Sequence, residues 1–234
     1  MKTEPEFIFG NSYAVFCGES RQNEFHHNVA FQIVMSQTHD VNIVDEHNNE
    51  FSGQVILIRP LIKSKIQCDG RLIHLYLSPS ISFTLDLIDL IGNSDIHILQ
   101  PHETLPINIR MSPNEIIDLL NNLEELSIER LDNRLLMVLD DLKQNLDNPS
   151  ILQAAKRAGL SRSRVRTLSR EQLGVPLSTW ITWRKLVKAN KALYNGASLT
   201  EAALAGHFSD QAHFSRTMKR MFGVTPTEAS LIYT

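Results

Sequence analysis

The chain has 234 residues, 42% of them hydrophobic and 21% charged, which is enough apolar material for one or two packed cores. No apolar run reaches the ~18 residues of a membrane span, and the acidic start lacks the apolar stretch of a signal peptide. Cys17 and Cys68 lack metal-ligand spacing, so we expect reduced thiols in a cytoplasmic protein.

The formal net charge of −3 conceals two unlike halves. Residues 1–131 hold 8 Lys and Arg against 18 Asp and Glu, a formal charge of −10. From residue 132 onward there are 15 basic and 8 acidic residues, a formal charge of +7. A basic half suits a polyanionic partner and an acidic half does not, so we expect two domains with two functions.

The first third of the chain contains short runs rich in Val, Ile, Phe and Leu, separated by turn residues. These runs are Val29–Ser36, Val41–Asp45, Gln54–Arg59 and Leu72–Ser78. Asp69 and Gly70 form a two-residue hairpin signal. Several short strands at this spacing predict a small β-sandwich or barrel over residues 1–108.

A helix is predicted over residues 112–126. Ser112 and Glu115 form a capping box with Pro113 at the first helical position. Apolar residues then recur at helical spacing: Ile116, Ile117, Leu119, Leu120, Leu123 and Leu126. This apolar stripe fits packing on the β-domain and a homodimer surface equally well, and we expect residues 109–130 to link the two halves.

Two stretches in the basic half have the same plan, after a helix expected at about Leu131–Leu146. Each reads as a short Ala-rich helix, a tight turn and a basic second helix. These stretches are Ser150–Arg170 and Ser198–Arg220. Capping boxes start the first helices, formed by Ser150 with Gln153 and by Ser198 with Glu201. We expect Ser161 and Ser209 to cap the second helices. A helix-turn-helix written twice predicts entry into two successive major grooves of double-stranded DNA. Taken alone, either unit could also be an ordinary helical hairpin.

Particular residues in this half carry a family resemblance. They are Ala155, Gly159–Ser161, Leu173–Pro176, Ala189, Leu193, Phe208–Arg216 and Phe222–Pro226. Through them, the chain from about Leu131 to Thr234 resembles the DNA-binding domain of AraC/XylS-type transcriptional regulators. The resemblance implies seven helices, with a long one near Leu177–Tyr194 that separates the two units. It also implies RNA polymerase as a partner if the protein is an activator.

Three positions depart from the family pattern. Ser169 stands where a large aromatic residue is usual, so we expect the first unit to pack loosely. His207 takes a turn position usually held by Gly, with Gly206 one residue early, so the turn must shift or His207 must adopt an unusual conformation. Met218 replaces an aromatic residue, which a flexible side chain tolerates.

The outward face of each second helix supplies the candidate DNA-binding residues. They are Arg162, Ser163, Arg164, Arg166, Thr167 and Arg170 in the first unit, and Gln211, Ala212, Arg216 and Lys219 in the second. Arg166 and Arg216 suit guanine and Gln211 suits adenine, whereas the remaining arginines suit phosphates. For any one Arg, the alternative is a solvated helix face or an ion pair within its helix.

The N-terminal half resembles, more faintly, the cupin-like sensor domain of some of these regulators, through His26–Ile33, Val55–Pro60 and Leu75–Pro79. Metal-binding cupins use two histidines one residue apart, a carboxylate and a later histidine. Here His26 and His27 are adjacent, and His74 is the remaining candidate for a third imidazole ligand. We therefore expect no metal or other cofactor, and a degenerate domain that senses a small molecule or dimerises.

These observations predict an α+β protein: a cupin-like β-sandwich or barrel (1–108), a linker helix (109–130) and an all-α domain with two helix-turn-helix units (131–234). We expect a sequence-specific transcriptional regulator without catalytic residues, whose partners are DNA, a small-molecule effector and a second copy. The alternatives are a cupin metalloenzyme fused to a DNA-binding domain, and a regulator whose N-terminal domain only dimerises.

Overall fold

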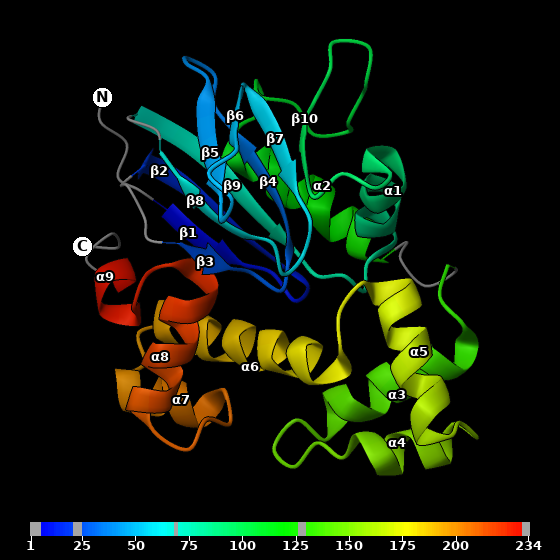
Figure 1. The fold of residues 1–234 in the computed structure, drawn as a ribbon. Coiled ribbons are helices and arrows are strands. Elements are labelled where there is room, and N and C mark those ends of the chain that lie inside the picture. The colour runs from blue at the N-terminus through cyan, green and yellow to red at the C-terminus, as the bar shows by residue number, and fades with distance from the viewer. Residues whose placement is uncertain (1–5, 21–24, 68–69, 126–129, 231–234) are drawn as a thin grey trace.

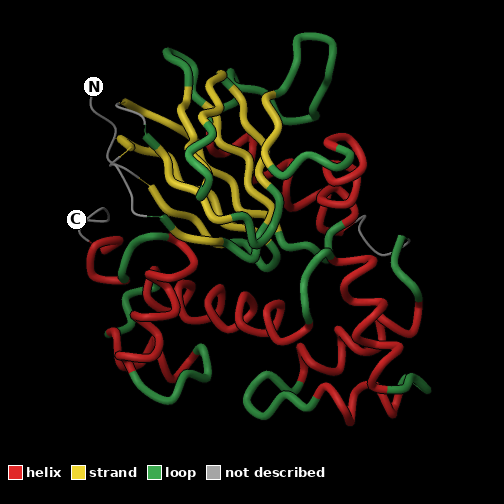
Figure 2. The backbone as a smooth tube through the Cα atoms, in the orientation of Figure 1, coloured by secondary structure: helices red, strands yellow, loops and turns green. Residues whose placement is uncertain are grey.

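The computed structural model describes residues 6–20, 25–67, 70–125 and 130–230 (Figures 1 and 2). A β-rich part is followed by a helical part, which confirms the predicted α+β class. The strands are β1 (Glu6–Phe9), β2 (Tyr13–Ser20), β3 (His26–His27), β4 (Phe31–Met35), β5 (Val41–Asp45), β6 (Glu50–Gly53), β7 (Val55–Ile58), β8 (Lys63–Ile66), β9 (Gly70–Leu77) and β10 (Ile96–Ile98). The helices are α1 (Ser82–Ile91), α2 (Pro113–Glu125), α3 (Asn133–Gln144), α4 (Ile151–Arg157), α5 (Arg162–Leu173), α6 (Leu177–Tyr194), α7 (Leu199–Ala205), α8 (Gln211–Phe222) and α9 (Pro226–Ser230).

Two antiparallel sheets form the β-domain. One has the strand order β1-β2-β9-β4-β7-β10 and the other β3-β8-β5-β6. Side chains from both sheets, among them Val34, Ile43, Ile56 and Leu72, form one buried cluster. The four strand runs predicted from composition coincide with β4, β5, β7 and β9, and this supports the predicted sandwich.

The two helices α1 and α2 contribute to a second core together with the larger sheet. Ile116 and Leu120 of α2 are fully buried there against residues of β2, β4 and β9. Tyr13 of β2 donates a 2.8 Å hydrogen bond from its hydroxyl to Oδ1 of Asn121. The apolar stripe of α2 therefore packs on its own β-domain, in agreement with the first of the two interpretations.

Seven helices, α3 to α9, follow in the described part of the α-domain. The α4–α5 and α7–α8 pairs lie near opposite ends of the long helix α6 (Figure 1). Trp180 near the start of α6 belongs to the core of the first unit, and Leu186 to that of the second. The core of the second unit also contains β-domain residues, including Phe7, Val29 and Tyr76. The two domains therefore share one hydrophobic core around α8.

The helix ends match the predictions with two corrections. The Ser198 and Glu201 box is complete, whereas Gln153 contributes only its main-chain N–H to the Ser150 hydroxyl. The cap of α8 is Asp210, whose carboxylate accepts from the N–H of His213, and not Ser209 as predicted. A carboxylate is the stronger acceptor, so it takes the cap while the Ser209 hydroxyl donates to it. Asp69 of the predicted hairpin lies outside the described residues.

Candidate nucleic-acid interface

The first candidate recognition helix is α5. Ser161 caps it by accepting from the N–H of Arg164, and Val165, Leu168 and Leu173 are buried as predicted. Every predicted DNA-binding residue on this helix is exposed, and a shallow groove is lined by Ser161, Arg162, Ser163, Arg166, Thr167 and Arg170. Arg164 lies outside this groove lining and is 3.8 Å from the Glu171 carboxylate. The face is thus basic and open, and the groove presents its arginines to an anion.

The second candidate recognition helix is α8. Phe214, Met218 and Phe222 are buried, and the predicted residues Gln211, Ala212, Arg216 and Lys219 are all exposed. Arg220 is also exposed and was missed by the sequence interpretation, although a Lys–Arg pair in a last helical turn is a recognisable basic signal. The two candidate faces therefore repeat one arrangement, with an apolar inner stripe and a basic outer one.

Ser169 is buried in the first unit and its hydroxyl has a hydrogen-bond partner. It is 1% exposed, and its hydroxyl donates a 2.6 Å hydrogen bond to the carbonyl of Val175. This bond satisfies the hydroxyl and also ties α5 to the connection that leads into α6. Nothing in the described contacts shows the loose packing expected from the missing aromatic ring.

The turn of the second unit is built around Gly206 and His207. A Cβ on Gly206 would lie 2.6 Å from the Cβ of Ala189 and 2.7 Å from the carbonyl oxygen of Lys185, so only glycine lets α7 approach α6 this closely. The left-handed conformation therefore falls on His207, with φ of 57°, which confirms that this residue adopts an unusual backbone geometry. Lys188 Nζ lies 2.8 Å from His207 Nε2, and burial, followed by the charge of Lys188, lowers the pKa of His207.

The β-domain contacts α8 directly. The Asn28 side chain is fully buried; its Nδ2 donates a 2.5 Å hydrogen bond to the carbonyl of Met221, and its Oδ1 accepts from the N–H of Ala30. Tyr76 packs edge-on against Phe222, with ring centroids 5.0 Å apart. The position of α8 is consequently fixed by the β-domain as well as by its own unit.

Further hydrogen bonds join the β-domain to α6. Arg184 donates to the carbonyl of Asn11, Lys191 Nζ lies 2.7 Å from Asn11 Oδ1, and Trp180 Nε1 lies 3.2 Å from Ser80 Oγ. Trp180 and Trp183 are buried, so both pack in the cores of the two units and neither is available to stack on bases. The α6 helix is thus held along its length by the domain above it (Figure 1).

The three histidines considered as metal ligands do not converge. His26 and His27 pair with Ser64 and Lys63 on successive positions of β3, so their side chains point to opposite faces. Both ring nitrogens of His74 are already engaged, at 3.0 Å from Gln32 Oε1 and 2.9 Å from the Tyr76 hydroxyl. Burial, together with the nearby His26, holds the pKa of His74 well below its usual value. No group of three His, Cys, Asp or Glu residues suited to a metal occurs among the described residues.

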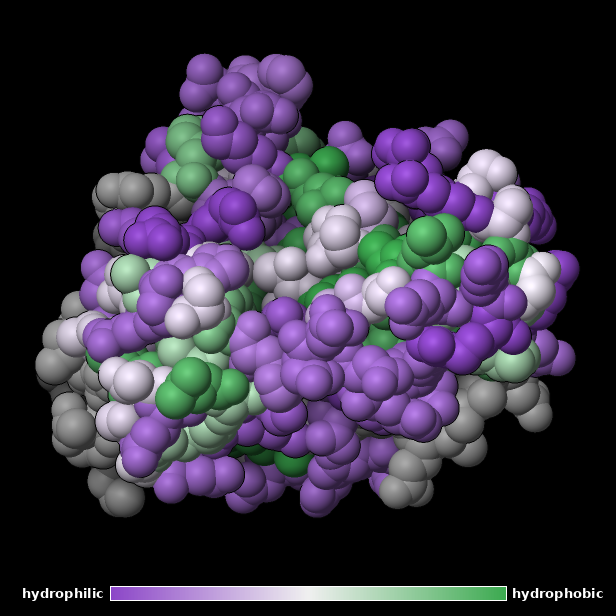
Figure 3. All heavy atoms as spheres, turned by 90° about the horizontal axis from the view of Figure 1, so that it is seen from below, coloured by the Kyte–Doolittle hydropathy of each residue, from purple (hydrophilic) through white to green (hydrophobic). Residues whose placement is uncertain are grey.

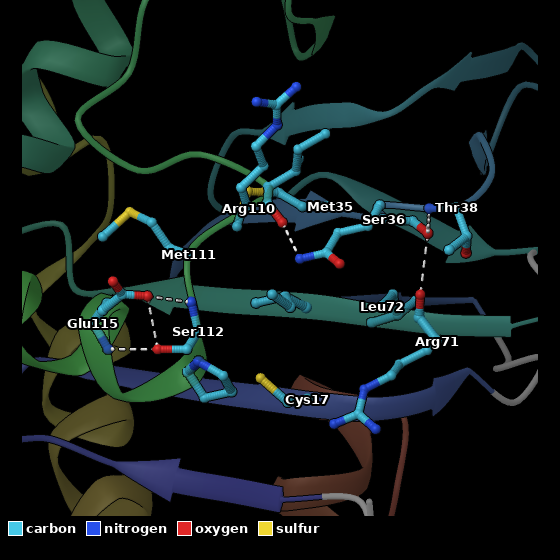
Figure 4. A pocket seen from close by; sticks show the side chains of 14 residues that line it. Cys17, Met35, Ser36, Thr38, Arg71, Leu72, Arg110, Met111, Ser112 and Glu115 are labelled. Atoms are coloured by element: carbon cyan, nitrogen blue, oxygen red, sulfur yellow. Dashed lines mark hydrogen bonds between the residues drawn. The ribbon is translucent and has the colours of Figure 1, made fainter. Parts of the chain in front are cut away.

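The β-domain contains a cavity of about 250 Å³ beside the start of α2 (Figure 4). Its apolar lining includes Cys17, Met35 and Ile73, from three neighbouring strands. The side chains of Arg71 and Arg110 extend from its edge in different directions (Figure 4). Sequence reasoning did not find this cavity, because it depends on how residues 109–115 lie across the sheet.

The surface seen from below is mostly hydrophilic, with smaller hydrophobic areas (Figure 3). Within the described residues, no helix is both long and apolar enough to cross a membrane. The exposed large apolar residues of the helical domain, Met137, Leu152, Tyr194 and Leu204, come from four different helices.

The helical domain is similar in sequence to domains of known proteins. Residues 154–230 match the family model described as a helix-turn-helix domain. Over 93 residues the chain is 36% identical to YkgA of Escherichia coli K12, named as an HTH-type transcriptional regulator, and the match covers 39% of each chain. Over 78 residues it is 31% identical to the virulence regulon transcriptional activator VirF of Yersinia enterocolitica, covering 33% of this chain and 29% of VirF. The matches thus span less than half the length of these relatives.

The whole chain resembles a solved structure in fold. The crystal structure of ToxT from Vibrio cholerae superposes with a TM-score of 0.59 and 13% identity, covering 94% of this chain and 98% of ToxT. This similarity extends over the β-domain and the helical domain together. Residues 154–230 of the helical domain thus match a helix-turn-helix domain, and this part of the chain is similar in sequence to bacterial transcriptional regulators.

Proposed function

We propose that this protein is a sequence-specific DNA-binding transcriptional regulator that reads two successive major grooves. The observation that carries the proposal is the repetition of one capped helix-turn-helix unit near each end of α6, each with an exposed basic second helix. The 18 residues of α6 span roughly 27 Å at 1.5 Å per residue. One turn of B-DNA is about 34 Å, so the DNA is expected to bend toward the protein or to contact one unit more weakly.

Each exposed side chain has a role in this proposal. Arg166 and Arg216 read guanine, and Gln211 reads adenine, because their long planar groups can reach base edges from the middle and start of each helix. Ser163, Thr167 and Ala212 lie beside them and contact bases or methyl groups. The remaining basic residues bind phosphates and set the register of the protein: Arg162, Arg164, Arg170 and Lys219.

Selection from a pool of random duplexes tests the proposal. The purified full chain should enrich one bipartite sequence whose two conserved parts are centred about one helical turn apart. The same selection with Arg166→Ala should lose sequence preference in one part, and with Arg216→Ala in the other. Failure to enrich any sequence at about 100 mM salt, where non-specific binding is weakened, would refute the proposal.

An effector for the β-domain is a second part of the proposal. ToxT has been crystallised with an unsaturated fatty acid bound. In this chain, the cavity of about 250 Å³ is slightly smaller than the ~300–1,000 Å³ of ordinary ligand pockets, so it suits a compact and largely apolar molecule. A screen of small apolar compounds by thermal shift tests this. A true ligand should lose its effect in Ile73→Phe, which fills the cavity, and keep it in Ile62→Phe, outside the cavity lining.

The other predicted features follow from the same function. As a regulator of transcription the protein would act in the cytoplasm, and as an activator it would contact RNA polymerase. A second copy would have to use the half-buried part of the α2 stripe, such as Ile117 and Leu123, or another surface, since Ile116 and Leu120 are buried in the β-domain. The metalloenzyme alternative is disfavoured because His26 and His27 point to opposite faces and His74 already has two partners.

A further inference from the structure

A groove runs between the β-domain and α8. Its lining comes from both domains: Phe25, His26, His27, Arg216, Lys219, Arg220 and Gly223. Arg216 and Lys219 are two of the proposed DNA contacts, so one wall of the groove is the outer face of α8. The other wall belongs to β3, and α8 and β3 are in close contact. Whatever binds α8 on this face must therefore lie next to the β-domain.

Two lysines lie beside the β-domain wall of this groove, although the half of the chain that forms this wall is acidic. His27 and Lys63 are register partners in the β3–β8 pair and so share a face of the sheet. Lys65, two residues further along β8, is on the same side. We call His27, Lys63 and Lys65 the β3–β8 rim.

Phe25 connects the rim to the groove. Its ring is 37% exposed and lines the groove, with the Lys65 ammonium 4.9 Å and the Lys63 ammonium 6.0 Å from its centroid. A ring face attracts a cation at this distance, and this holds the two ammonium groups beside the groove. The rim thus extends the basic surface of α8 across the domain boundary.

Among the described residues, the carboxylates near this surface form at most a weak ion pair with its cations. Glu46 is 4.0 Å from Lys63 with both side chains about half exposed, a separation at which an ion pair contributes little. Asp210 and Glu228 influence Arg216 and Lys219 through space, but no ion pair is formed by Lys65, Arg216, Lys219 or Arg220 within the described residues. These cations lie next to one another along α8 and the β3–β8 rim, and an extended polyanion is the partner whose charge complements them.

We infer that the β3–β8 rim binds the DNA phosphate backbone flanking the groove read by α8, so that the β-domain is part of the DNA interface. The inference rests on the proposed function, because it requires α8 to lie in a major groove. A backbone that leaves that groove past the end of α8 meets Lys219 and Arg220, and the rim is the adjoining basic surface. Positively charged side chains at phosphates add affinity without sequence preference and make binding more salt-dependent.

The test compares the full chain with the double variant Lys63→Ala/Lys65→Ala on two duplexes. One duplex ends at the sequence selected by the wild-type chain, and the other extends it by about one helical turn on the side read by α8. On the extended duplex the variant should bind several-fold more weakly, and the slope of log affinity against log salt should fall by about 0.9 for each phosphate that the variant no longer neutralises. On the short duplex the two proteins should bind alike. Lys143→Ala is the matched control, an exposed cation on α3 outside this groove, and should behave as wild type on both duplexes.

Three results separate the possibilities. Identical salt slopes for variant and wild type on the extended duplex would overturn the inference. Tighter binding by the variant would also overturn it, since the rim would then hinder DNA rather than bind it. Failure of the wild-type chain to prefer the selected duplex over random DNA would instead refute the proposed function. Thermal unfolding of each variant establishes that it is folded.

Discussion

Asn28 donates a 2.5 Å hydrogen bond from Nδ2 to the main-chain carbonyl of Met221, across the boundary between the β-domain and α8. The two residues are 193 positions apart in the chain, and the Asn28 side chain is fully buried. The carbonyl belongs to the last turn of α8, where helix carbonyls lack partners within the helix. The β-domain therefore acts as the C-terminal partner of a recognition helix.

Replacing Asn28 should loosen this connection. Asn28→Ala removes a buried donor and leaves the Met221 carbonyl without that bond, which is expected to lower the free energy of unfolding by about 1–3 kcal/mol. Urea unfolding measures this loss, and amide exchange should show the largest change in the last turns of α8. Asn42→Ala, at an exposed position of β5, is the control and should change stability by less than about 0.5 kcal/mol. Equal exchange in α8 for wild type and Asn28→Ala would show that the bond does not hold the helix.

The two candidate base-reading arginines can be distinguished from phosphate-binding ones. Arg166→Ala or Arg216→Ala should each cost about 1–3 kcal/mol on the selected site and relax preference at one base pair. Arg170→Ala should weaken binding to selected and random DNA by a similar factor, because a phosphate contact carries no sequence information. Competition titrations measure both quantities, with Lys143→Ala on α3 as an exposed control. An equal loss of affinity on all sequences for Arg166→Ala would mean that Arg166 contacts phosphate and does not read a base.

The backbone geometry at His207 predicts that a glycine variant is more stable than an alanine variant at this position. His207 has φ of 57°, so His207→Gly should be more stable than His207→Ala by about 1 kcal/mol, because only glycine adopts this conformation without cost. Neither variant can keep the hydrogen bond between the His207 ring and Lys188, so its absence cancels in the comparison. At Leu204, exposed in α7, the order should reverse, with Ala the more stable. Chemical denaturation of the Gly and Ala variants at both positions measures their free energies of unfolding. The same order of stability at His207 and Leu204 would contradict the left-handed conformation of His207.

Stability should fall on acidification because His74 is buried with a depressed pKa. The unfolded chain binds a proton near pH 6.5 and the folded chain only at lower pH, so the unfolded state holds more protons in between. The contribution of His74 to the free energy of unfolding is thus fully present above about pH 6.5. It is lost as pH falls toward the folded-state pKa, at up to about 1.4 kcal/mol per pH unit. Urea unfolding from about pH 8 to 5 measures this dependence. His74→Gln should flatten it and the exposed His102→Gln should not; an unchanged slope in His74→Gln would assign the effect to other groups.

Local patterns in the sequence were sufficient for much of the helical domain. Capping residues, Ala-rich first helices and basic outer faces are all set by spacing within a dozen residues, and the structure has most of them where these patterns place them. The strands that were missed, such as β3 and β8, are short and polar, so their alternation is too brief to detect. The α1 helix was missed because Ile81 gives its start no side-chain cap.

The contacts between the domains could not be predicted from such patterns. Asn28, Tyr76 and Phe222 are distant in sequence, and none of them has a neighbour that signals its partner. The same limit applies to the basic rim, because Lys63 and Lys65 lie in a short polar segment that carries no signal until β8 is placed beside β3 and α8. Tertiary packing alone brings these residues together.

We propose that α5 and α8 read two successive major grooves while α6 holds them at a fixed separation. Inserting five base pairs between the two parts of the selected site turns the second groove by about half a helical turn, to the far side of the DNA. An equilibrium titration of the full chain on the original and the lengthened site tests the claim most directly. Binding to the lengthened site should fall to the level of random DNA; undiminished affinity would mean that only one of the two units reads DNA.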